Sequence, residues 1–142
     1  MLNTHAAAVH FRIQMAGEAA EHTVTFALAG RVLAARGEMQ KIVDNLNHAI
    51  TYLTTAGTFP QLLAYVEDLK KFYTDQAGKM RIVNMRDAKA IGADIYNAQG
   101  SLLAADPFVG IFSEQYRAST AGHFSPLQGT PALHSEPAHI TG

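Results

Sequence analysis

The feature that most constrains the fold is a stripe of apolar residues at alternating spacings of three and four. The stripe consists of Val24, Leu28, Val32, Ala35, Met39, Ile42, Leu46, Ala49 and Leu53. Such spacings bring side chains to one face of an α-helix. A looser continuation toward the N-terminus extends the prediction to one helix over about residues 5–55. At roughly 1.5 Å per residue, this helix would be about 75 Å long.

The beginning of this region has a second interpretation. Apolar and polar residues alternate over residues 9–15 and again over 24–28, which is the pattern of a half-buried β-strand. Residues 17–22 would then connect the two strands of a hairpin within residues 8–28. We favour the helix, because the flanking residues are rich in alanine and the stripe continues without a break into residues 28–53.

Three shorter helices are predicted after the long one. Thr58 and Pro60 mark the start of the first, as a capping hydroxyl and a proline in the first turn. The second covers about residues 79–105, where apolar residues again keep helical spacing. Asp106-Pro107 starts a short last helix. Short connections make successive helices antiparallel neighbours, so the predicted fold is mainly α, a long N-terminal helix and three shorter helices in an antiparallel bundle.

Residues 93–104 have a competing interpretation as two short strands around a turn at Gly100. Over about fifteen residues, this segment resembles the hairpin of PAS- and Cache-type sensor modules. The resemblance implies an α+β fold with a hairpin at 93–104. It also implies a module that binds a small molecule.

The composition changes after Arg117, because no Lys or Arg follows it whereas three of the five prolines do. Each Pro removes a backbone donor and restricts its predecessor. We therefore predict a helical domain over residues 1–119 and an extended C-terminal tail over residues 120–142. Apolar residues along such a tail suit docking in a groove, either of its own bundle or of a neighbouring subunit. The predicted docking residues are Phe124, Leu127, Leu133 and Ile140.

Charge narrows the range of partners. The chain of 142 residues has a formal net charge of −1, so it lacks the positive field that supports unspecific binding to nucleic acid or anionic membranes. Six of its eleven basic residues nevertheless lie close together in the sequence. This basic segment consists of Lys70, Lys71, Lys79, Arg81, Arg86 and Lys89. It is the predicted contact for phosphate, nucleic acid or an acidic neighbour, although ordinary charge pairing at a solvated surface is the simpler interpretation.

The sequence contains no motif of catalysis or cofactor binding. It has no Cys, which excludes disulfides, thiolate nucleophiles and Cys-ligated metals. The seven histidines form neither His-Glu-x-x-His nor paired Glu-x-x-His, and the chain has no glycine-rich phosphate loop and no Gly-x-Ser-x-Gly elbow. We therefore predict no catalytic, metal-binding or cofactor-binding residues.

The N-terminal residues lack the basic and apolar regions of a secretory signal peptide. No window approaches the roughly eighteen apolar residues of a membrane span. We expect a soluble or particle-associated protein, and the sequence leaves its compartment open.

These observations favour a non-catalytic structural subunit of a homo- or hetero-oligomeric assembly, such as a virion, a filament or a secretion-type particle. The long helix and the tail would pack against neighbouring copies, because a thinly apolar helix of this length buries little area alone. One alternative is a small-molecule-binding sensor module, which needs the hairpin at 93–104. A second is an adaptor that contacts nucleic acid through residues 70–89.

Overall fold

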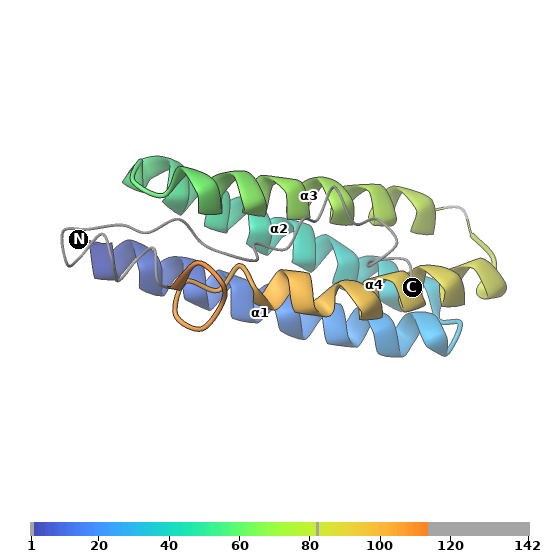
Figure 1. Ribbon diagram of the computed structural model, residues 1–142. Coiled ribbons are helices and arrows are strands. Elements are labelled where there is room, and N and C mark those ends of the chain that lie inside the picture. The colour runs from blue at the N-terminus through green and yellow to red at the C-terminus, as the bar shows by residue number, and fades with distance from the viewer. Residues whose placement is uncertain (1, 82, 114–142) are drawn as a thin grey trace.

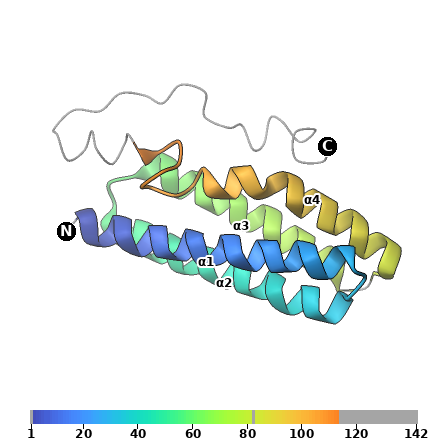
Figure 2. The same ribbon diagram turned by 90° about the horizontal axis from the view of Figure 1, so that it is seen from below.

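The computed structural model describes residues 2–81 and 83–113, and these residues form four α-helices. The helices are α1 (Leu2–Leu28), α2 (Val32–Ala56), α3 (Pro60–Met80) and α4 (Met85–Leu103). Each helix runs antiparallel to the one before it, and together they form a bundle (Figure 1, Figure 2). The prediction of a mainly α, antiparallel bundle is confirmed.

The hairpins considered for residues 8–28 and 93–104 are wrong, because both segments lie within helices and the described residues contain no strand. The physical reason is burial. Ile13 and Ala16 of α1, and likewise Ile95 and Ala98 of α4, are buried at a spacing of three, which a helix places on one face and a strand places on opposite faces. The α+β fold implied by the resemblance to sensor modules is wrong for the same reason.

The expected helix over residues 5–55 is divided in two at Gly30. Gly30 has a φ of +74°, in the left-handed region that residues with a Cβ rarely adopt. Its N–H donates to Ala27 O at 3.0 Å and the N–H of Arg31 donates to Phe26 O at 2.8 Å, which is the Schellman pattern of a helix end. α2 then folds back along α1, so most of the stripe is buried inside one chain, whereas Leu28 beside the turn is exposed. The N-terminal helix is still the longest, with 27 residues.

The core combines small side chains on α1 with larger ones on the other helices. Five of the eight buried apolar residues of α1 are alanines, so its neighbours can approach closely. The bulk comes from α2, α3 and the segments that flank α3 and α4. Among the largest fully buried side chains are Met39, Leu46, Phe59, Leu69 and Tyr73. The alanine excess in the composition therefore serves helix contacts within the chain.

The segment that follows α4 differs from the short last helix expected there. Residues 107–112 form successive turns, and residues beyond 113 lie outside the described part of the chain. Asp106 caps as predicted, since its Oδ1 accepts from the Phe108 N–H at 2.8 Å. A Cβ at Gly110 would collide with the backbone carbonyl of Ala104, so the tight fold of this segment requires glycine. The turns place Phe112 in the core, 2 % exposed.

The remaining helix ends explain where α3 and α4 begin. α3 begins at Pro60 without a side-chain cap, so the expected role of Thr58 is not seen. α4 begins at Met85 because the Asn84 side chain accepts from the Asp87 N–H at 2.9 Å, and this cap separates α3 from α4. Within the described residues, no helix has the length and apolar character needed to cross a membrane.

Candidate functional site

Asp106 is the one completely buried carboxylate among the described residues. Gln14 Nε2 and His10 Nδ1, both on α1, lie 2.8 Å from its Oδ2, and the Phe108 N–H donates to its Oδ1 at 2.8 Å. Because a carboxylate only accepts, the Nδ1 of His10 carries the proton in this contact. Both carboxylate oxygens therefore have partners, as a buried charge requires. We call Asp106, His10, Gln14 and Phe108 the Asp106 clasp.

The clasp joins the segment after α4 to the first half of α1. The His10 side chain is 35 % exposed and stacks on Phe108, with ring centroids 4.6 Å apart. A carboxylate that holds Nδ1 leaves Nε2 for another partner, an arrangement that can orient a general base. Catalysis also needs a nucleophile or a bound substrate within reach. The three donors of the clasp all converge on Asp106, so the geometry accounts directly for a structural role.

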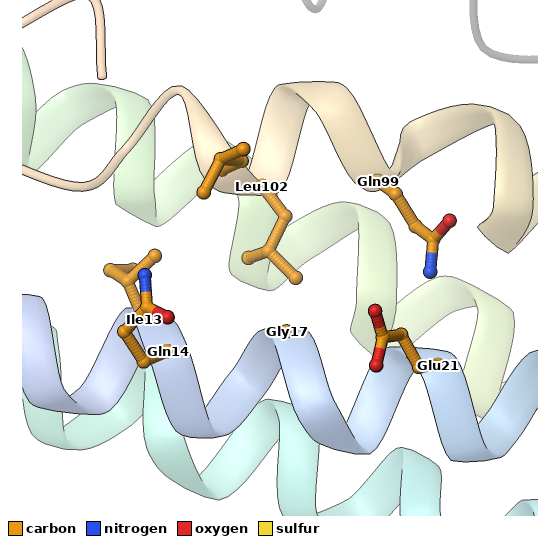
Figure 3. A pocket seen from close by; sticks show the side chains of 7 residues that line it. Ile13, Gln14, Gly17, Glu21, Gln99 and Leu102 are labelled. Atoms are coloured by element: carbon orange, nitrogen blue, oxygen red, sulfur yellow. The ribbon is translucent and has the colours of Figure 1, made fainter. Parts of the chain in front are cut away.

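A groove of about 220 Å³ lies between α1 and α4 and begins beside the clasp, with Gln14 belonging to both. Its lining residues are Ile13, Gln14, Gly17, Glu21, Gln99, Leu102 and Leu103. Figure 3 shows Leu102 reaching toward α1 near Gly17, and Glu21 and Gln99 pointing toward each other from the two helices. The groove is open at Gly17, where an added Cβ would meet nothing within 4 Å. Its lining includes an acidic residue and no basic one.

Exposed apolar side chains gather on this side of the bundle. Nine large apolar side chains are exposed in the described part of the chain, and six of them belong to α4, to the segment after it or to the end of α1 that packs on α4. These six are Leu28, Met85, Tyr96, Leu103, Phe108 and Val109. Tyr96 and Leu103 are seven residues apart and therefore share one side of α4. We call this surface, together with the groove, the α1–α4 face; a gathering of this kind typically marks an interaction surface.

A larger groove, of about 650 Å³, lies between α2 and α3. Its lining residues are Leu33, Arg36, Gly37, Gln40, Thr74, Ala77, Gly78 and Arg81. The two arginines are both exposed, and no acidic residue lines the groove. Leu33 is the most exposed large apolar residue of the described chain, at 78 %. The α2–α3 groove therefore combines positive charge with an apolar side chain that projects into solvent.

The α1–α4 face and the α2–α3 groove lie on opposite sides of the bundle. α1 packs against α2 and α4, and α3 also packs against α2 and α4, so the four helices form a ring in chain order. In such a ring, the side shared by α1 and α4 is opposite the side shared by α2 and α3 (Figure 2). The linings of the two grooves therefore differ in charge, and the two grooves open in opposite directions.

The structure separates members of the predicted basic segment. Arg81 lines the α2–α3 groove, whereas Lys79 lies on the side of α3 that is near Asp94 of α4. Burial raises the pKa of Asp94 and the positive charge of Lys79 opposes this shift. Arg86 Nε lies 3.9 Å from Asp87 Oδ1, a loose and exposed pair. The remaining members are Lys70, which is half-buried, and Lys71 and Lys89, which are exposed.

A contact of this segment with nucleic acid stays a prediction, and of its six members only Arg81 lines a groove described here. The predicted tail residues lie outside the described part of the chain; they are Phe124, Leu127, Leu133 and Ile140.

Neither the clasp nor the two grooves could be predicted as sites from the sequence. His10 and Asp106 are separated by 96 residues, and only the capping role of Asp106 could be seen locally. In the described residues, no group of three or more His, Cys, Asp or Glu side chains is arranged to hold a metal ion. Comparisons with protein-family models, curated proteins and solved structures gave no match to this chain.

Proposed function

We propose that this chain is a non-catalytic, self-associating helical subunit of a larger assembly, such as a filament or particle. The observation that carries the proposal is the gathering of six exposed large apolar side chains on the α1–α4 face. Water contact with this much apolar surface is unfavourable by about 25 cal/mol per Å², and a second protein surface removes it.

The bundle itself supports a role in binding other proteins. The buried residues of all four helices form one cluster inside the chain, and the six exposed apolar side chains of the α1–α4 face do not belong to it. The exposed apolar residues of the face are therefore not required for folding. They are available for an interface whose centre is apolar and whose rim carries charge.

The experiment measures mass against concentration. Sedimentation equilibrium and light scattering of the full chain, from about 1 µM to about 200 µM, should give a weight-average mass that rises above the 15.3 kDa of one copy. Replacing Leu103, which is 54 % exposed on the α1–α4 face, by Ser should weaken association by about tenfold or more.

The matched control is Phe11→Ser. Phe11 is 53 % exposed on α1, so the two variants remove apolar side chains of similar exposure, and this control should leave association unchanged. A mass of 15.3 kDa for the unmodified chain at every concentration would overturn the proposal. So would equal effects of Leu103→Ser and Phe11→Ser, because the α1–α4 face would then have no special part in association.

A further inference from the structure

The linings of the two grooves differ in charge, so each groove complements the other and neither complements a second copy of itself. The lining of the α1–α4 groove contains Glu21 and no basic residue, and Glu18, three residues earlier on α1, is also exposed. The lining of the α2–α3 groove contains Arg36 and Arg81 and no acidic residue. Two copies of either groove would place like charges opposite each other, whereas one copy of each pairs Glu21 with Arg36 and Arg81.

The apolar parts of the two surfaces also have complementary shapes. Leu33 projects at one edge of the α2–α3 groove and is 78 % exposed. On the other surface, the space over Gly17 is open, and Ile13 and Leu102 provide apolar walls. The α1–α4 groove has a volume of about 220 Å³, which accommodates an aliphatic side chain. In the reverse direction, the groove of about 650 Å³ has room for exposed apolar side chains such as Phe108 and Val109.

We infer that copies of this chain associate head to tail, with the α1–α4 face of one copy docked on the α2–α3 groove of the next. The inference rests on the proposed function and names the second surface of its interface. Because the two surfaces lie on opposite sides of the bundle, each copy uses one surface for each neighbour. A heterologous contact of this kind repeats, and it produces an open chain of subunits unless the rotation between copies closes it into a ring.

The test uses two variants that each block one surface. Arg36→Glu with Arg81→Glu reverses the charge of the α2–α3 groove, and Leu103→Glu adds a charge to the α1–α4 face. Both blocked surfaces are then acidic, so they do not attract each other. All three residues are exposed, and circular dichroism should show the helix content and thermal midpoint of the unmodified chain.

Each variant alone should be monomeric at concentrations where the unmodified chain assembles, with association weakened about tenfold or more. Mixed in equal amounts, the two variants should form a 1:1 complex that grows no further, since the intact face of one meets the intact groove of the other. Tyr96→Glu, on the same side of α4 and 63 % exposed, replaces Leu103→Glu if that variant is unstable.

Three results would overturn head-to-tail association. The first is a mixture that stays monomeric, and the second is a mixture that grows beyond the 1:1 complex. The third is a groove variant that assembles like the unmodified chain while Leu103→Glu does not, which indicates an interface of two identical α1–α4 faces. This third result leaves the proposed function intact, whereas an unmodified chain that never exceeds 15.3 kDa removes both.

Discussion

Replacing Asp106 by alanine removes the acceptor of the clasp. Three hydrogen bonds disappear, from Gln14 Nε2, His10 Nδ1 and the Phe108 N–H. Hydrogen bonds to charged groups contribute about 1.5–3 kcal/mol each, and a buried donor left without a partner costs about 1–3 kcal/mol. Gln14 and His10 are both partly open to solvent, so water replaces part of what they lose. We therefore expect the free energy of unfolding to fall by about 3 kcal/mol, the net of the lost hydrogen bonds and the water that replaces them.

Urea unfolding followed by far-ultraviolet circular dichroism measures this change. Asp106→Asn should lower the free energy of unfolding by a smaller amount, about 1–2 kcal/mol. Its amide oxygen still accepts from the Phe108 N–H, whereas its NH₂ group opposes the donors on α1. Asp75→Ala removes an exposed carboxylate of α3 and should change stability by less than about 0.5 kcal/mol. A loss below about 1 kcal/mol for Asp106→Ala would refute the view that the clasp holds residues 104–113 in place.

Three further predictions concern single residues. Tyr73 is completely buried and its hydroxyl has no hydrogen-bond partner, so Tyr73→Phe should raise the free energy of unfolding by about 1 kcal/mol. Tyr65→Phe should lower the free energy of unfolding by about 1 kcal/mol, because the Tyr65 hydroxyl donates to Ser101 O at 2.9 Å. Gly30→Ala should destabilise the fold by about 1 kcal/mol or more, because φ is +74° at this residue. Gly17→Ala lies inside α1 with open space around it and should stabilise the fold by up to about 1 kcal/mol. Denaturant unfolding measures both changes and shows whether their signs are opposite. Burial raises the pKa of Tyr65 from 10.0 to about 12. The contribution of the neutral Tyr65 to stability is therefore complete below pH 10 and is lost as the pH rises toward 12. A tyrosinate titration in which all five tyrosines ionise together near pH 10 would contradict this.

The apolar stripe shows what the sequence could and could not predict about the fold. It identified helix correctly on both sides of Gly30, and its positions from Ala35 to Leu53 are buried in the structure, whereas Leu28 beside the turn is exposed. It could not reveal the turn at Gly30, because the spacing of three and four continues across the break. Glycine occurs both inside helices and at Schellman turns, so its presence alone does not distinguish the two. The packing of α2 against α1 favours the turn at Gly30.

The candidate site was less predictable than the fold. Asp106 was recognised as a cap from its position before a proline, and this local role is present. Its contacts with His10 and Gln14 depend on the packing of the first helix against the last, which no local pattern encodes. The two grooves could not be predicted for the same reason, since their linings come from helices that are adjacent only after folding. The hypothesis that the long helix stays uncovered without neighbours assumed an unbroken helix, whereas the turn at Gly30 lets α2 pack on α1 within one chain.

The clasp also has a consequence for the order in which the bundle forms. Successive helices are joined by turns of a few residues, so their pairing requires little loop-closure entropy. The contact between His10 and Asp106 spans almost the whole described chain, and its loop closes economically only after the intervening hairpins have formed. We therefore expect the seam between α1 and α4 to be the last part of the ring to close during folding. By the same reasoning, we expect this seam to be the first part of the native bundle to open, and the stability of the clasp to set the frequency of opening.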